Sequence, residues 1–160
     1  MNNKKHKTKG FTIVELIIVI MIFAIIFSAT SIVFADMIGK YGINNEAIKL
    51  VQILRETRMN SVSQLDGSKW GIELVDYAEP HCYIMFKGES YPSRDPAADV
   101  VFTLPRSINI NNISLGGDNE IVFDERSGYT NNSGSFSLSN KDKQIGFTIN
   151  DLGLVDYSYD

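Results

Sequence analysis

The sequence predicts an α+β fold in which one long N-terminal helix packs on antiparallel β-sheets. Three observations predict this fold. Residues 11–35 are almost wholly apolar. From residue 44, apolar side chains recur every three or four positions, which is the period of an amphipathic helix. Beyond residue 68, short runs of β-branched and aromatic residues alternate with Gly, Pro, Asn, Asp and Ser, the pattern of strands joined by turns.

Residues 1–10 form a short, polar and basic leader that has no capacity to form a core. The leader carries four lysines, whereas the whole chain has a formal net charge of −4. Its removal would therefore leave a side-chain charge of −8. A positive segment ahead of an apolar run is typical of a chain whose N-terminus stays in the cytoplasm while the remainder is exported.

Residues 11–35 are predicted to form a transmembrane or assembly helix. As a helix rising about 1.5 Å per residue, this segment is roughly 37 Å long, which exceeds a bilayer core of about 30 Å. Its early charge, Glu15, costs about 2.5–3.5 kcal/mol at a membrane centre and less near the edge, so such a residue is usually retained for a partner. A secretory signal peptide has a shorter apolar region and a small-residue cleavage site. A plain single-span anchor fits the length but gives no reason for Glu15.

Residues 36–66 are predicted to continue the helix into the domain as an amphipathic segment. Gly39 and Gly42 lower helix propensity by about 1 kcal/mol each and are candidate points of flexibility. Asp66 and Gly67 are a fitting stop. The expected core-facing stripe contains Ala47, Ile48, Val51, Leu54, Val62 and Leu65, with Leu50 close to it.

Residues 67–160 are predicted to form a β-rich globular domain built from antiparallel hairpins. One face of the sheet must be covered, and the helix stripe can cover it. The segment 89–98 contains two prolines and is expected to be an exposed loop. The expected strands span 69–75, 82–87, 99–104, 107–110, 120–124, 134–139, 144–149 and 153–157.

The segment Lys9-Gly10-Phe11-Thr12-Ile13-Val14-Glu15-Leu16, followed by a long apolar run, resembles the leader and N-terminus of type IV pilins and pseudopilins. This resemblance implies cleavage by a prepilin peptidase between Gly10 and Phe11. It also implies N-methylation of the new Phe11 amine. In that family the corresponding glutamate pairs with the N-terminal amine of a neighbouring subunit during assembly, and Glu15 occupies that position here.

The second half of the chain is similar to GspH/FimT-type minor pilins and pseudopilins. The similarity rests on an arginine-containing helix end over 54–62, a Trp70-Gly71 strand, the segment 121–128, and a strand, Gly turn and strand over 149–155. It implies two β-sheets packed against the helix. The sequence departs from many major pilins because its lone cysteine, Cys82, excludes an intrachain disulfide and its first proline is Pro80.

The sequence offers no candidate set of catalytic, cofactor-binding or metal-binding residues. His81 and Cys82 are adjacent, so on a strand they point to opposite faces and cannot easily share a metal. Asp76 with Glu79, and Asp124 with Glu125, are interpreted as solvated turns. Asp118, Asn119 and Glu120 lack the regular oxygen spacing of a calcium loop. We therefore expect no enzyme, no cofactor and no small-molecule substrate.

A DNA-binding or adhesive minor pilin at a pilus tip, as in DNA uptake, is the alternative function. A DNA site requires clustered basic residues with aromatic neighbours. The basic residues of the domain are scattered among acids and include Arg94, Arg106, Arg126, Lys141 and Lys143, with Tyr157 and Tyr159 near the end. Nucleic acid is accordingly not the expected partner.

The sequence as a whole predicts a minor pilin or pseudopilin that primes or joins a type IV pilus or a type II secretion pseudopilus. The expected partners are the prepilin peptidase, other pilin subunits and the cytoplasmic membrane. The expected location is a single pass through that membrane, with the N-terminus cytoplasmic and the domain outside, followed by the filament. Which machine the subunit serves stays open.

Overall fold

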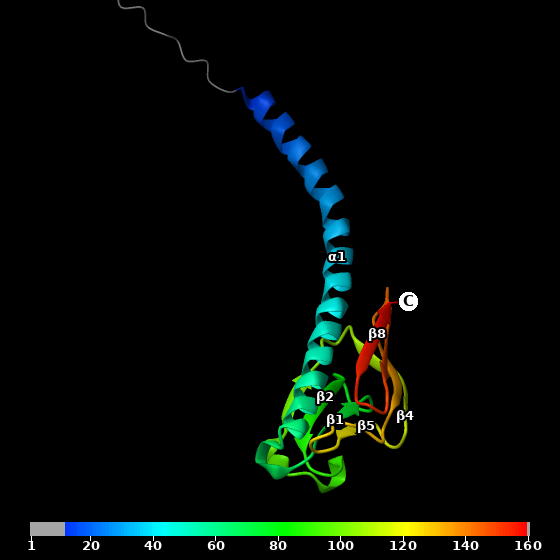
Figure 1. Ribbon diagram of the computed structural model, residues 1–160. Helices are drawn as coiled ribbons and strands as arrows, with labels where there is room; N and C mark the ends of the chain where they lie inside the picture. Colours follow the sequence, from blue (N-terminus) through cyan, green and yellow to red (C-terminus); the bar gives the residue numbers. More distant parts are fainter. Residues whose placement is uncertain (1–11, 160) are drawn as a thin grey trace, which may run out of the picture. The chain divides into compact units, whose positions relative to one another are not determined.

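The computed structural model describes residues 12–159, without the side chains of residues 28–41. In this span one long helix, α1, covers Ile13–Val62, and eight strands follow it. The chain divides into two compact units, one ending at Ile38 and one beginning at Gly39 (Figure 1). Gly39 and Gly42, expected as points of flexibility, both have helical backbone.

The second half of α1 buries one apolar face in the domain. Ile43, Ala47, Leu50 and Leu54 are fully buried, and Val51 is nearly so. This spacing of three and four residues continues through two buried polar side chains, Thr57 and Ser61. The sequence prediction included Ile48 and Leu65 in the stripe, but both side chains are exposed, whereas Leu50 belongs to it.

The helix ends four residues earlier than the predicted stop at Asp66–Gly67. A short 3-10 turn, Leu65–Gly67, follows it. Gln64, Asp66 and Gly67 have positive φ values of 52°, 57° and 58°, which are incompatible with continued right-handed helix. The chain therefore reverses within a few residues and enters the first strand.

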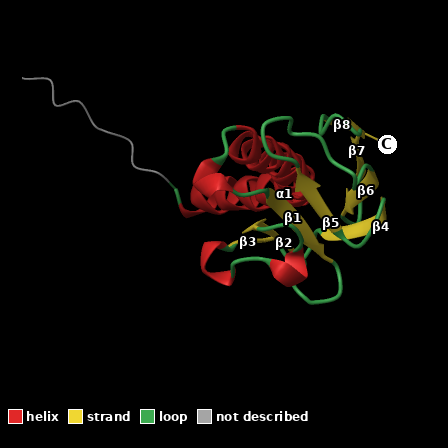
Figure 2. Cartoon of the chain, turned by 60° about the horizontal axis from the view of Figure 1, so that its bottom comes forward, coloured by secondary structure: helices red, strands yellow, loops and turns green. Residues whose placement is uncertain are grey.

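The domain contains two four-stranded antiparallel sheets (Figure 2). The first sheet has the order β3 (Val100–Thr103), β2 (Cys82–Lys87), β1 (Trp70–Val75) and β5 (Glu120–Phe123). The second has the order β4 (Asn109–Leu115), β6 (Gly134–Ser139), β7 (Gln144–Ile149) and β8 (Val155–Tyr159). The predicted antiparallel strands are thus confirmed, including the separation into two sheets.

Two of the predicted strands differ from the observed ones by two or more residues at an end. The strand expected at 107–110 extends to Leu115, because β4 continues past an irregularity between Asn111 and Ser114. Asn112 has a φ of 53° at that point, and this kind of bulge is not visible in the side-chain alternation. The last strand begins at Val155 and not at Gly153, since Gly153 belongs to the preceding turn with a φ of 71°.

Both sheets contribute to one core with the helix. Figure 1 shows the second half of α1 lying alongside the strands. The core joins the buried stripe of α1 to Ile72, Leu74 and Tyr83 from the first sheet, and to side chains such as Phe136 and Phe147 from the second. The helix stripe therefore covers the sheets as the sequence predicted.

The segment 89–98, expected to be an exposed loop, is largely exposed, but it has regular structure and packs on the first sheet. It forms two short helical turns, Tyr91–Ser93 and Pro96–Ala98. The Asp95 N–H donates to the Lys87 carbonyl over 2.9 Å, and the Tyr91 ring meets Phe86 edge-on at 5.5 Å. This segment covers the face of the first sheet that lies away from α1, so β1 is buried along its whole length.

Candidate functional site

Thr12 caps the first turn of α1 and places Glu15 at its third position. The Glu15 N–H donates to Oγ1 of Thr12 over 3.3 Å, and the Leu16 N–H donates to the Thr12 carbonyl over 3.2 Å. Threonine three residues before glutamate has the spacing of a capping box, and a carboxylate in the first turn interacts favourably with the helix dipole. This local role of Thr12 was missed in the sequence analysis. The predicted cleavage and methylation positions, Gly10 and Phe11, lie outside the described residues.

The helix behind Glu15 exposes large apolar side chains on all sides. Between Ile13 and Phe27 their exposed fractions range from 38% at Val19 to 78% at Ile13. Exposed apolar surface of this extent marks a site of protein or membrane contact. No helix among the residues that the structure describes is both long and apolar enough to cross a membrane. The predicted segment 11–35 extends on both sides beyond the side chains that are described.

Three sequence segments that carried the family resemblance meet at Arg58. Its Nε donates to the Gly128 carbonyl over 3.0 Å, and its Nη2 donates to the Leu152 carbonyl over 3.3 Å. A Cβ on Gly153, which has a φ of +71°, would lie 2.1 Å from the same Gly128 carbonyl oxygen. We call Arg58, Gly128, Leu152 and Gly153 the arginine junction. It ties the helix end to two distant turns, so these residues have a structural reason to occur together.

The Trp70-Gly71 pair joins the helix end to β1. The buried Ser61 hydroxyl accepts from the Trp70 N–H over 2.8 Å and lies 3.3 Å from the Trp70 carbonyl, to which it donates. The indole Nε1 donates to the Leu65 carbonyl over 3.2 Å. A Cβ on Gly71 would lie 2.6 Å from the Phe86 ring, so only glycine fits there. This motif is therefore explained by packing.

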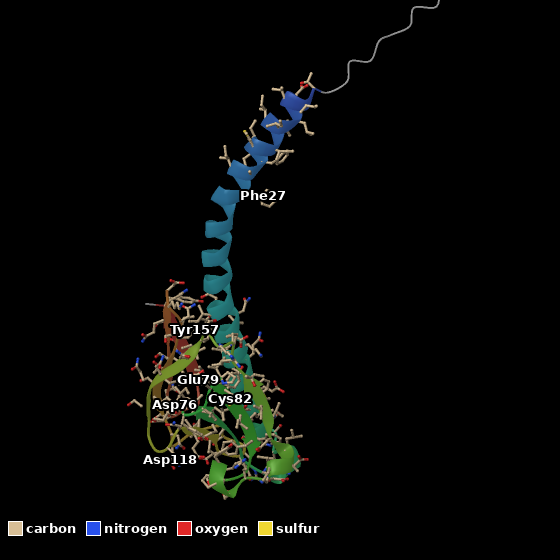
Figure 3. The ribbon with its side chains drawn as sticks, turned by 180° about the vertical axis from the view of Figure 1, so that it is seen from behind. Phe27, Asp76, Glu79, Cys82, Asp118 and Tyr157 are labelled. Carbon is tan, nitrogen blue, oxygen red and sulfur yellow. The ribbon has the colours of Figure 1, made fainter. Side chains whose placement is uncertain are left out.

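The carboxylate pairs singled out in the sequence do not converge on a site. Asp76 accepts from the Asn119 amide over 3.1 Å, and Glu79 lies 3.5 Å from Nε2 of His81 (Figure 3). Asp124 is 3.0 Å from the Lys69 ammonium. In the described part of the chain, no group of three His, Cys, Asp or Glu side chains could hold a metal ion.

His81 and Cys82 have separate surroundings. Nδ1 of His81 accepts from the Ile110 N–H over 2.9 Å, which connects β4 to the residue just before β2. Cys82 is a free, partly buried thiol, and burial raises its pKa. A raised pKa reduces the thiolate fraction and hence the reactivity of the cysteine.

Two of the basic residues considered for DNA contact, Arg94 and Lys143, are already engaged with neighbouring side chains. Arg94 binds both carboxylate oxygens of Asp99, at 2.8 and 3.1 Å. The Lys143 ammonium lies 2.9 Å from the Asn44 side-chain oxygen and 4.0 Å from the centre of the Tyr159 ring. The exposed Arg106, Arg126 and Lys141 are separated along the chain.

The structure forms one acidic cavity that sequence reasoning missed. Glu73 on β1 and Glu120 on β5 are directly opposite each other, and their exposed fractions are only 8% and 9%. They line a cavity of about 430 Å³ whose other walls are Tyr91, Pro92 and residues 117–119. The available signal was one carboxylate in each of two otherwise apolar strands, within β1 for Glu73 and at the start of β5 for Glu120. The segment 89–98 packs over this side of the first sheet, and the strand pattern gives no indication of that cover.

Residues 5–31 match the family model described as the prokaryotic N-terminal methylation motif. The motif is followed by a long helix packed on antiparallel sheets, and this arrangement is a pilin-like α+β fold. Its fold is similar to that of the minor pseudopilin EpsH from the type 2 secretion system of Vibrio cholerae. The TM-score is 0.52 at 12% identity, over 74% of this chain and 97% of EpsH, so the likeness concerns the fold. No curated protein sequence matches the chain.

Proposed function

We propose that this protein is a minor pilin or pseudopilin, a structural subunit that primes or joins a type IV pilus or a type II secretion pseudopilus. A prepilin peptidase cleaves it between Gly10 and Phe11, and the new Phe11 amine is methylated. The observation that carries the proposal is the exposed apolar surface of α1 directly behind the capped Glu15. Such a surface requires partners, and the methylation motif over residues 5–31 suggests which partners they are.

Glu15 serves as the assembly contact in this proposal. Once the leader is removed, the Phe11 amine of one subunit and the Glu15 carboxylate of a neighbour become complementary charges. In a low-dielectric setting the loss of one partner of a buried ion pair costs about 3–5 kcal/mol. A subunit therefore leaves the membrane favourably only when its carboxylate meets an amine in the filament.

The apolar surface of α1 supplies the other contacts. In the cytoplasmic membrane it faces lipid, with the N-terminus in the cytoplasm and the β domain outside. In the filament the same side chains, such as Ile17, Ile18 and Phe23, pack against helices of neighbouring subunits. The subunit acts through assembly, and the proposal assigns it no substrate or cofactor.

The proposal is tested first by the intact mass and N-terminal sequence of the protein isolated from membranes. The protein is expressed with and without a prepilin peptidase. We expect a mature chain that begins at a methylated Phe11 only when the peptidase is present. An uncleaved chain in the presence of an active peptidase would refute the proposal.

A second test separates assembly from processing. Glu15→Ala should leave cleavage largely intact and abolish incorporation into sheared filaments. Glu56→Ala removes an exposed carboxylate elsewhere on α1 and is the matched control, expected to assemble normally. Normal incorporation of Glu15→Ala would rule out the pairing mechanism.

The alternative of a DNA-binding or adhesive tip subunit has no specific observation in its favour among the described residues. Arg94 and Lys143 are engaged with neighbouring side chains. An electrophoretic mobility shift with the full-length protein distinguishes the two functions. A shift at low salt would favour the alternative, because phosphate contacts dominate such binding.

A further inference from the structure

The cavity beside Glu73 holds more negative charge than the protein itself compensates. The Glu120 carboxylate accepts from the Tyr91 N–H over 2.5 Å. The Glu73 carboxylate, by contrast, has no hydrogen-bond or ion-pair partner among the described residues, although only 8% of the residue is exposed. Its oxygens keep some contact with solvent in the cavity. An ionisable group that is largely withdrawn from water without a partner is still unfavourable, so such a group is usually retained for a ligand or partner.

The charged groups that act on Glu73 come from several neighbouring segments. Glu120 lies opposite on β5. Asp118 stands in the turn before that strand, and Asp76 follows β1; Figure 3 labels both. Burial first, then Glu120, Asp118 and Asp76, raise the pKa of Glu73 to about 7, and Arg94 opposes them.

Arg94 is the nearby cation, but its guanidinium is committed elsewhere. It forms two bonds to Asp99, donates to the Tyr91 carbonyl over 2.9 Å and lies 3.8 Å from the centre of the Tyr91 ring. Arg94 therefore fixes the Tyr91 wall of the cavity and leaves the Glu73 carboxylate without a direct contact. The space beside the Glu73 carboxylate can therefore accept a cation from outside the protein.

The lining indicates what kind of cation fits. A metal ion is held by several converging ligands, and no suitable group of three His, Cys, Asp or Glu side chains is present among the described residues. Tyr91 and Pro92 instead provide surface for an aliphatic stem, and Glu73 and Glu120 provide acceptors for its charged head. Pro92, Gly117 and Asp118 are exposed, so they form a rim that is open to a neighbouring protein.

From this geometry we infer that the cavity lined by Glu73, Glu120 and Tyr91 receives a lysine or arginine side chain from another protein. The cationic head lies between the two glutamates, and its aliphatic stem lies along Tyr91 and Pro92. This inference goes beyond the proposed function, since it concerns the β domain and would stand even if Gly10 were never cleaved.

The test uses full-length protein in detergent micelles, labelled with ¹⁵N at its seven tyrosines. The Tyr91 amide, which donates to Glu120, reports on the cavity and is assigned by its loss in Tyr91→Phe. The probes are Nα-acetyl-lysine methylamide and the matching arginine compound. We expect saturable shifts of this amide with both probes and none with the norleucine analogue, which has a similar stem without the charge.

Two variants and one change of pH complete the test. Glu73→Gln keeps the shape of the side chain and should weaken probe binding at least tenfold, whereas Glu89→Gln, an exposed acid outside the cavity, should not change it. Binding at pH 8 should be about tenfold tighter than at pH 6, since the cation favours ionised Glu73. If Glu73→Gln binds the probes as tightly as the parent, the inference is wrong.

Two further titrations test whether the cavity binds a different kind of cation. Tighter saturation by Ca²⁺ than by either amino-acid probe would replace the inference with a metal site. Tighter saturation by spermidine would replace the protein side chain with a free polyamine. Failure of prepilin cleavage, by comparison, would overturn the proposed function and leave these titrations unchanged.

Discussion

Replacing Gly153 with alanine tests whether the arginine junction is rigid. Gly153 has a φ of +71°, where an L-residue with a Cβ costs about 1–2 kcal/mol. The added Cβ would lie 2.1 Å from the Gly128 carbonyl oxygen and 3.1 Å from Nε of Arg58. Because the first distance is far inside van der Waals contact, one of the two turns has to move.

The size of the effect follows from what that movement disrupts. The Gly128 oxygen accepts the 3.0 Å bond from Arg58, so its displacement lengthens a hydrogen bond from a charged donor, worth about 1.5–3 kcal/mol. Together with the backbone cost, Gly153→Ala should destabilise the protein by about 3–5 kcal/mol. For a domain of this size, that loss lowers the unfolding temperature by roughly 12–20 °C, at about 4 °C per kcal/mol.

The chain offers two matched controls for this substitution. Gly67 has a similar φ of +58°, but a Cβ added there would meet no atom within 4 Å, so Gly67→Ala measures the backbone cost alone. Gly42 is helical, with open space around it, so Gly42→Ala should be neutral or stabilising by about 1 kcal/mol.

The assay is thermal unfolding of the full-length protein in detergent, followed by the fluorescence of its single tryptophan, Trp70. Trp70 is 7% exposed, so its emission changes when the domain opens. If Gly153→Ala unfolds within a few degrees of Gly67→Ala, the two turns relax freely and the reasoning about the junction is refuted.

Three further predictions concern the core, the start of β1 and pH. Leu54→Ala should cost about 2–5 kcal/mol in thermal unfolding, because Leu54 is fully buried, whereas Ile48→Ala on the exposed side should cost less than about 1 kcal/mol. Ser61→Ala should cost about 1–3 kcal/mol by leaving the Trp70 N–H without its 2.8 Å partner; circular dichroism measures it, and a loss below about 0.5 kcal/mol would contradict the contact. The pKa of Glu73 is raised from 4.5 to about 7, so its stabilising contribution is complete below about pH 4.5 and is lost as pH rises through about 7. Glu73→Gln should flatten the fall in unfolding temperature over that range, and an unchanged slope would exclude Glu73 as its cause.

The sequence predicted the elements of the fold because each rests on local periodicity. The three- and four-residue repeat after Asn44 identified the amphipathic helix, and the alternation of β-branched runs with turn residues located all eight strands. The predicted stripe wrongly included Ile48 and Leu65, which are exposed, and placed the fully buried Leu50 only close to it. Periodicity predicts that a helix has a buried apolar face, but it predicts less reliably which residues lie at the edges of that face. Those residues depend on how the helix is rotated against the sheets.

The functional assignment also came from local sequence. Gly10, Phe11 and Glu15 lie in one short segment after the leader, so the roles proposed for them needed no tertiary information, and residues 5–31 match a methylation motif. The arginine helix end, Trp70-Gly71 and the glycines at 128 and 153 were recognised only as separate motifs. The contacts that connect these motifs, at the arginine junction and at Ser61, could be identified only from the folded structure.

The sequence did not predict the acidic cavity, because segments far apart in the chain bury its two glutamates. Glu73 and Glu120 are 47 positions apart and become opposite neighbours only through the pairing of β1 with β5. The segment 89–98 then covers them and leaves only 8% of Glu73 and 9% of Glu120 exposed, in a cavity that stays open at its rim. Sequence alone therefore determined the N-terminal motif, the helix and the strands, since each depends on neighbouring residues. Tertiary structure alone decided which carboxylates are buried together, because burial depends on segments that meet only after the chain has folded.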